Sequence, residues 1–248
     1  MTPKEKVISV ALAEEGYLEK KTNYNLDSKT ENAGKANYTK YSRDLLKLIG
    51  SPYAQGVAWC DIFVDWCFVT AFGVDVAKRL INGWSAYTPT SADNYKKVKR
   101  WYNSPEVGDQ IFFKNSSRIC HTGLVYKVDA TRVYTVEGNT SNAASVVANG
   151  GCVALKSYLL NTSSIAGYGR PDYSIIQSDQ SKVVTTKAFV DGTDITEALN
   201  PKNFNVEKYR NKFKDLENAF GDDWALYYKH YVTCGKIEIE AGKRQTFM

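Results

Sequence analysis

The order of the periodic patterns along the chain constrains the fold more than any other feature. Residues 3–15, 38–49 and Trp59–Phe72 repeat apolar side chains at helical spacing, and a fourth helical pattern covers Thr90–Tyr102. After a turn at Pro105–Asp109 the chain changes to short strand patterns, which are Gln110–Phe113, His121–Val128, Arg132–Glu137, Cys152–Tyr158 and Ile165–Gly169. Helices followed by a run of sequential strands predict an α+β fold with N-terminal helices and an antiparallel sheet.

A polar, threonine-rich stretch divides the chain. Residues 176–199 are typical of a linker, and a small hairpin at Phe189–Thr193 is compatible with the same residues. Two helical stripes follow: the first runs from Val206 to Phe220, and the second from Trp224 to Tyr231. We therefore predict a domain at 1–175, a linker at 176–199 and a small helical domain at 200–248.

Composition limits the location and the partners of the protein. No stretch approaches the roughly 18 apolar residues of a membrane span, and the N-terminus lacks the apolar run of a signal peptide. We expect synthesis in the cytoplasm without a signal peptide and without membrane insertion. The net charge of +5 favours an anionic partner such as a cell wall, although a solvated surface explains it equally well. No basic run with interleaved aromatic residues indicates nucleic-acid binding.

The cysteines indicate free thiols. None of the five lies in a CxxC pair, and two histidines cannot complete a zinc finger, so no structural metal site is expected. Cys60 and Cys67 are two helical turns apart, roughly 10 Å along the axis. That separation is too long for a disulfide.

Cys60 and His121 are the candidate nucleophile and base. Cys60 lies at the predicted start of a helix, where backbone N–H groups and the helix dipole favour a thiolate. His121 is the only histidine among the first 229 residues, so any imidazole chemistry in this part of the chain requires it. Cys67 is expected in the core, and Cys120 points away from its neighbour His121 on a strand. For each residue alone, a structural role is the more common one.

Two polar residues follow at the end of the third predicted strand. Glu137 and Asn139 are two apart, so on a regular strand they project to the same face. Either side chain could accept a hydrogen bond from the imidazole and fix its tautomer. The order Cys, His, then two polar residues is that of a thiol hydrolase.

A loop near the N-terminus has the spacing of a weak cation site. Asn23, Asn25 and Asp27 alternate as in calcium loops, but the triplet holds one carboxylate, whereas Ca²⁺ prefers several. Calcium here is a minor alternative to a site without metal or cofactor.

The chain resembles the CHAP family, the cysteine- and histidine-dependent amidohydrolases and peptidases among the papain-like hydrolases. The resemblance covers about residues 1–175. It lies in the segments Ala58–Val64, Pro105–Phe113, His121–Tyr126 and Tyr134–Thr140, and Gly16–Lys20, Asn37–Tyr41 and Gly167–Pro171 are similar to endolysins of phages and prophages of Gram-positive hosts.

The resemblance implies peptidoglycan amidase or endopeptidase activity. It makes Cys60 the nucleophile on an amide carbonyl, His121 the base and then the acid, and Glu137 the group that orients the imidazole, with Asn139 sharing that task or polarising the site. The Cys60 N–H is the natural first donor to the oxyanion, and Gln55 is a weak candidate for the second. Trp59 and Tyr53 either line the substrate groove or pack in the core. Other members bind calcium in an acidic loop that this sequence lacks.

The C-terminal segment Asp215–Gly221 resembles small helical modules of Gram-positive cell-wall proteins. The resemblance implies binding to peptidoglycan or to anionic wall polymers, with Tyr209, Trp224 and Tyr228 as candidate contacts, and a packing appendage is the alternative. The leading hypothesis is an endolysin released by a holin or by lysis. A non-catalytic wall protein on a CHAP scaffold and a thiol acyl or peptidyl transferase are the alternatives.

Overall fold

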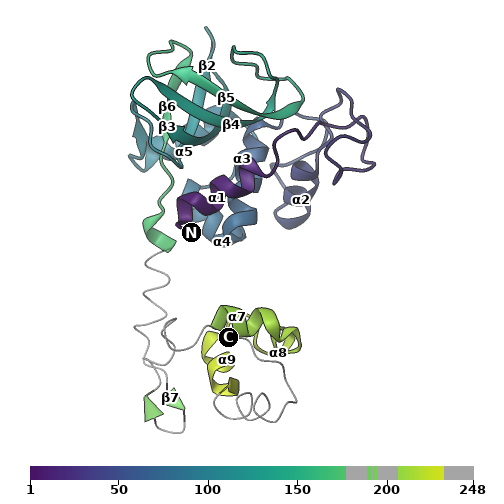
Figure 1. The fold of residues 1–248 in the computed structure, drawn as a ribbon, viewed down its shortest axis with the longest axis vertical. Coiled ribbons are helices and arrows are strands. Elements are labelled where there is room, and N and C mark those ends of the chain that lie inside the picture. Colours follow the sequence, from purple (N-terminus) through teal and green to yellow (C-terminus); the bar gives the residue numbers. More distant parts are fainter. Residues whose placement is uncertain (177–188, 191–192, 195–205, 232–248) are drawn as a thin grey trace. The chain divides into compact units, whose positions relative to one another are not determined.

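The computed structural model describes residues 1–176, 189–190, 193–194 and 206–231 (Figure 1). The chain divides into two compact units, residues 1–175 and residues 176–248. The first unit contains both the helices and the sheet that carry the candidate active-site residues, and each unit is described by itself.

Five named helices lead the first unit: α1 (Pro3–Leu12), α2 (Lys40–Leu48), α3 (Cys60–Phe72), α4 (Val74–Ile81) and α5 (Thr88–Lys97). Short polar caps start the first two. Thr2 and Glu5 form a reciprocal capping box at α1, and the Thr39 hydroxyl accepts from the Ser42 N–H at α2. Gly73, with φ +77°, ends α3 where the sequence predicts its end.

Helix α3 is the central helix of the unit. Ten of its thirteen residues are buried, and α1, α2, α4, β3 and β4 all pack against it. In Figure 1 the helices α1, α3 and α4 gather on one side of the sheet. The apolar stripe predicted from the sequence therefore understates its burial, since even Asp61 and Asp65 are 1% exposed.

A six-stranded antiparallel sheet completes the unit, in the order β1-β6-β2-β3-β4-β5. Its strands are β1 (Trp101–Tyr102), β2 (Gln110–Lys114), β3 (Ile119–Val128), β4 (Arg132–Thr140), β5 (Cys152–Leu159) and β6 (Ile165–Gly169). The predicted α+β class with an antiparallel sheet is confirmed. Consecutive strands β2 to β5 are neighbours, and β6 returns to pair with β2 on the side away from β3.

Two elements of the first unit, α4 and β1, were not predicted from the sequence. Helix α4 was not predicted, because its eight residues follow Gly73 directly and mix apolar and charged side chains. The helix predicted over Thr90–Tyr102 ends at Lys97, and Trp101–Tyr102 instead forms β1 against Tyr168 and Gly169. Lys99 adopts φ +57°, a left-handed conformation that stops the helix and turns the chain into the sheet.

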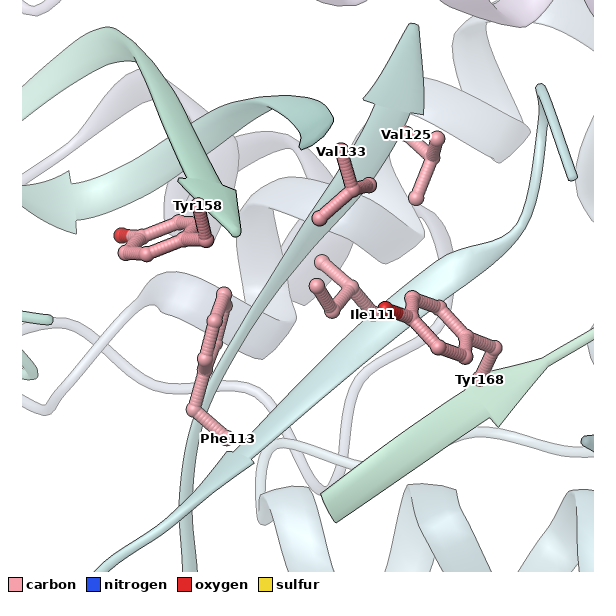
Figure 2. Close-up of a cluster of buried hydrophobic side chains, with 6 residues drawn as sticks. All are labelled: Ile111, Phe113, Val125, Val133, Tyr158 and Tyr168. Carbon is pink, nitrogen blue, oxygen red and sulfur yellow. The ribbon is translucent and has the colours of Figure 1, made fainter. Parts of the chain in front are cut away.

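One face of the sheet carries a compact apolar cluster. Figure 2 shows its members, which are Ile111, Phe113, Val125, Val133, Tyr158 and Tyr168. The Phe113 ring stacks on the imidazole of His121 with the centroids 5.8 Å apart, and it also contacts Tyr158 at 4.8 Å. The cluster therefore packs against the candidate base and restricts the movement of its ring.

The second unit contains short helices: α7 (Val206–Lys212), the 3₁₀ turn η1 (Lys214–Leu216), α8 (Glu217–Phe220) and α9 (Trp224–His230). The single stripe predicted from Val206 to Phe220 is interrupted at Phe213, whose ψ of +76° leaves the helical region. The core of the unit is Val206, Tyr209, Phe213, Leu216 and Tyr227. Two-residue strands β7 (Phe189–Val190) and β8 (Thr193–Asp194) pair antiparallel, while most of the predicted linker lies outside the described residues.

Among the described residues, no helix combines the length and the apolar character that crossing a membrane requires.

Candidate active site

Cys60 is the first residue of α3, with Trp59 at the N-cap position. Its side chain is 5% exposed. The first N–H groups of a helix have no acceptor within the helix, so the thiol lies where backbone donors and the helix dipole stabilise negative charge. The structure thus places the candidate nucleophile at the helix start that the sequence predicts.

His121 and Glu137 meet across the β3–β4 pair. Leu124 pairs with Val136 in this antiparallel ladder, which brings the start of β3 next to the end of β4. Nε2 of His121 lies 2.9 Å from Oε2 of Glu137, and both side chains are completely buried. The imidazole and the carboxylate therefore form a dry ion pair when the ring is protonated.

The contact with Glu137 defines which ring nitrogen is available for chemistry. A carboxylate oxygen accepts, so Nε2 carries a proton in this pair, and Nδ1 is left to exchange one. Nδ1 is buried and has no hydrogen-bond partner among the described residues. Burial lowers the pKa of His121, but interactions with the Cys60 thiol and with Glu137 outweigh it and raise that pKa to about 9. The thiol thus lies close enough to the imidazole to affect its pKa. It does not make a regular hydrogen bond with Nδ1.

The carboxylate of Glu137 is held by two further hydroxyl groups. Thr135 Oγ1 donates to Oε1 at 2.6 Å, and the Tyr158 hydroxyl donates to Oε2 at 3.3 Å. Burial and the nearby Glu137 raise the pKa of Tyr158, which keeps its hydroxyl a donor. Neither Thr135 nor Tyr158 was predicted from the sequence; only the i, i+2 spacing of Thr135 and Glu137 on one strand face could have indicated the first.

Two glycines make room for this arrangement. A Cβ at Gly123 would lie 2.6 Å from Cγ of Glu137 and 2.9 Å from the carbonyl oxygen of Val136. A Cβ at Gly138 would lie 2.6 Å from Cβ of Phe63 on α3. Gly123 therefore leaves the space in which Glu137 reaches His121, and Gly138 lets β4 approach the helix that carries Cys60.

Asn139 is buried and follows Glu137 by two residues, but its amide makes hydrogen bonds with neither Glu137 nor His121. Its Oδ1 accepts from the Gly151 N–H at 3.4 Å, and its Nδ2 lies 3.5 Å from the Ala148 carbonyl oxygen. A φ of +55° and a register shift between Glu137 and Thr140 break the strand alternation at this point. The structure thus brings Cys60, His121 and Glu137 together, whereas the Asn139 amide contacts Ala148 and Gly151 of the loop that follows β4; its catalytic role stays a prediction.

The three candidate groove residues are engaged in internal contacts. Trp59 is fully buried and donates from Nε1 to Glu19 at 2.9 Å, and the Tyr53 hydroxyl donates to Asp65 at 2.6 Å. The Gln55 amide donates to the Thr39 carbonyl oxygen and accepts from the Thr39 N–H. These contacts favour the packing alternative for Trp59 and Tyr53, and they occupy the Gln55 amide.

The other described cysteines lie in different surroundings. All four described cysteines are free thiols, and Cys234 lies outside the described residues. Burial raises the pKa of Cys67 well above its ordinary value, and it also raises the pKa of Cys120 and Cys152. A raised pKa keeps a thiol protonated at neutral pH and makes it a poor nucleophile.

The loop proposed for calcium uses its polar groups internally. The Asp27 carboxylate accepts two hydrogen bonds from the Arg43 guanidinium, at 2.7 and 2.8 Å, and Asn25 donates to Glu31. Within the described residues, no cluster of three or more His, Cys, Asp or Glu side chains could hold a metal ion. A cation would have to displace Arg43 from the single carboxylate of the triplet, so this donor set, as arranged, does not fit Ca²⁺.

Two of the candidate wall-binding residues, Tyr209 and Tyr228, differ in their burial. Tyr209 is fully buried, and its hydroxyl lies 2.8 Å from Nδ1 of His230. Tyr228 is partly buried and packs against the core of the unit. The side chain of Trp224 lies outside the described set. Tyr209 is thus a core residue of the module in this structure.

Comparison with protein families gives a match within the first unit. Residues 52–139 match the CHAP domain family, a segment that begins before Cys60 and ends at Asn139. This segment of the first unit is thus similar to a CHAP domain. Domains of this family generally act as peptidoglycan hydrolases or amidases, and the matched segment includes all three residues that converge in the site. Comparisons of the chain with curated proteins and with solved structures gave no match.

Proposed function

We propose that the protein hydrolyses an amide bond of bacterial peptidoglycan through a Cys–His thiol mechanism. The observation that carries the proposal is the buried arrangement of the CHAP domain, in which Glu137 contacts Nε2 of His121 while the Cys60 thiol raises the pKa of the same ring. A thiol beside an imidazole at a helix N-terminus can pass its proton to the ring, and the imidazolium that forms and the helix dipole then stabilise the reactive thiolate.

In the first half of the reaction, Cys60 loses its proton to Nδ1 of His121, and its sulfur attacks the amide carbonyl carbon. The carbonyl oxygen becomes an oxyanion, and we expect the Cys60 N–H at the start of α3 to stabilise it. The imidazolium then gives its proton to the amide nitrogen. The C–N bond breaks, the amine leaves, and a thioester joins the substrate to Cys60.

In the second half, water attacks the thioester carbonyl, and Nδ1 of His121 takes a proton from that water. The C–S bond breaks, and the thiolate and the acid product are released. Glu137 holds the ring orientation and stabilises the imidazolium in both halves, and Thr135 and Tyr158 hold Glu137 in turn.

We also propose that the protein is an endolysin of a phage or prophage of a Gram-positive host, and that the second unit binds the wall. This part rests on the sequence resemblance of the catalytic and C-terminal segments. Wall binding would keep the catalytic unit at a high local concentration on its insoluble substrate.

Analysis of the products released from purified Gram-positive sacculi tests the proposed reaction. New N-terminal amines, with matching new carboxylates in the muropeptides, are the expected products, and mass spectrometry will identify the bond that is cut. Products that carry a new amide or ester in place of the carboxylate would establish a transferase. Absence of any cleavage by freshly reduced protein would support the non-catalytic alternative.

A further inference from the structure

A single buried amide connects the segments that carry the thiol and the imidazole. Asp61 follows Cys60 on α3, and Thr122 follows His121 on β3. Nε2 of Gln110, on β2, donates to Oδ1 of Asp61 and to Oγ1 of Thr122, with both distances 3.1 Å. Gln110 therefore bridges the immediate neighbours of the two catalytic candidates.

The surrounding groups fix the bridge at each end. The Tyr95 hydroxyl donates to Oε1 of Gln110 at 3.1 Å, so the amide uses both its donors and its acceptor. Asp61 accepts a second hydrogen bond from Ser91 Oγ at 2.6 Å, and Thr122 donates to the Ile111 carbonyl oxygen at 2.7 Å. No alternative orientation of the amide satisfies all of these partners equally well.

The bridge is completely inside the protein. Asp61 and Gln110 are 1% exposed, and Thr122 is fully buried. A buried amide or carboxylate is unfavourable unless its hydrogen bonds are made, and a fully satisfied network adopts one arrangement. Apolar contacts between a helix and a sheet tolerate small sliding movements, whereas paired hydrogen bonds of this length do not. The network is therefore suited to holding α3 and β3 at one spacing.

The two buried carboxyl groups near the thiol, those of Asp61 and Asp65, have raised pKa values. Asp65, one turn after Asp61, accepts from the Tyr53 hydroxyl and the Ser85 N–H, so both acids receive their hydrogen bonds from neutral groups. Burial raises the pKa of Asp61 to about 7, and burial with the nearby Asp61 raises that of Asp65 well above its ordinary value. A positioning role accounts for the pair without requiring ionised carboxylates.

We propose that Gln110 is a positioning residue, which sets the spacing between the Cys60 thiol and the His121 imidazole by bridging Asp61 and Thr122. The proposal rests on the thiol mechanism proposed above. Small displacements of reacting groups have large effects on rate, so loss of the bridge is expected to reduce the chemical step with little effect on substrate binding.

The test uses the full chain and the alkylation of Cys60 by iodoacetamide, followed at the Cys60 peptide by mass spectrometry from about pH 5 to about pH 10, which spans the range of activated and ordinary thiols. Thr122→Val removes the hydroxyl and keeps the shape, while Thr122→Ser keeps the hydroxyl. Gln110→Met breaks both ends of the bridge. Tyr41→Phe, which loses a buried 2.8 Å hydrogen bond to Glu14, is the matched control for destabilisation.

We expect Cys60 to be alkylated about 10-fold more slowly at neutral pH in Gln110→Met and in Thr122→Val. On peptidoglycan fragments kcat should fall while KM stays nearly constant. Thr122→Ser and Tyr41→Phe should keep the wild-type alkylation profile. The double variant Gln110→Met/Thr122→Val should be scarcely worse than Gln110→Met alone, because both changes break the same bridge.

Wild-type alkylation profiles in folded Gln110→Met or Thr122→Val protein would overturn the positioning role. If Gln110→Met does not fold, the Thr122→Val and Thr122→Ser pair decides, since each changes a single buried group. Equal losses in both Thr122 variants would also count against the bridge. The alkylation assay needs no wall substrate, so a wild-type protein that alkylates as expected but never cleaves peptidoglycan would disprove the proposed function and leave the bridge intact.

Discussion

Thr135 and Glu137, two residues apart on β4, are joined by a hydrogen bond of 2.6 Å from Oγ1 to Oε1. This bond occupies the carboxylate oxygen that does not face His121, so Oε2 is directed at the imidazole. Tyr158 adds a second donor to Oε2 from the neighbouring strand. The carboxylate that contacts the imidazole is thus itself held in one orientation, which limits the movement of both side chains.

Replacing Cys60 should abolish catalysis while preserving the fold. We expect Cys60→Ala to lose at least about 10³-fold in the rate of sacculus cleavage, because one sulfur makes the covalent intermediate. Cys67→Ala and Cys120→Ala are the controls and should keep most of the specific activity. Circular dichroism will establish that each variant is folded. Normal cleavage by Cys60→Ala, purified free of wild type, would rule out the assigned nucleophile.

The pH dependence of cleavage should follow the ionisation of His121. Its pKa is raised to about 9, so the imidazolium needed to protonate the leaving amine persists to that pH and is lost above it. Glu137→Gln removes an interaction that raises this pKa. The basic limb of kcat/KM should therefore move to lower pH by about one unit, as measured on soluble muropeptide fragments. An unmoved limb in Glu137→Gln would show that another group controls it.

Gly123 should be intolerant of even a methyl group. In Gly123→Ala the new Cβ would meet Cγ of Glu137 and the Val136 carbonyl oxygen, so the carboxylate would be displaced from His121. We expect a loss of about 10-fold to 100-fold in kcat. The double variant Gly123→Ala/Glu137→Gln should be little worse than the more damaged single variant, since both act on one contact. Wild-type kcat in Gly123→Ala would show that the contact is dispensable.

Asp65 should make the protein less stable as the pH rises. Its pKa in the folded protein is raised by burial and by Asp61, so the unfolded chain loses this proton first, and stability is lost from about pH 4 upward. Asp65→Asn cannot ionise. We expect its Tm to exceed that of the wild type by at least about 2 °C at pH 8, and by less at pH 4.5. An advantage that is equal at both pH values would contradict ionisation as the cause.

Removing residues 176–248 tests the role of the second unit. The first unit has its own core and sheet, so the fragment 1–175 should fold and cleave soluble muropeptides at nearly the full-length rate. Its rate on intact sacculi should fall by about 10-fold or more, because tethering to the wall is lost. Sedimentation of the isolated 176–248 fragment with purified walls is the direct check. Equal rates on sacculi, or a fragment that stays in solution, would refute wall binding.

Much of the catalytic unit could be predicted from sequence because its signals are local. The helical stripe before Gly73 placed Cys60 at a helix start, and the strand patterns after Pro105 gave the antiparallel sheet. The predicted end of α5 was wrong because Lys99 adopts a left-handed conformation that its residue type does not indicate. The two residues of β1 form a strand only because they pair with β6. Short elements of this kind depend on tertiary contacts more than on propensity.

The sequence by itself determined the α+β class and the start of the helix at Cys60. It also left His121 as the single candidate imidazole among the first 229 residues, because no other histidine occurs there. Only the tertiary structure decided between Glu137 and Asn139 as the partner of Nε2. The alternation that puts both on one face holds for a regular strand, but the positive φ of Asn139 and the register shift beside it break that alternation. The Gln110 bridge could likewise not be predicted from the sequence. Its three hydrogen-bonded residues come from α3, β2 and β3, and they meet only when the helix packs on the sheet.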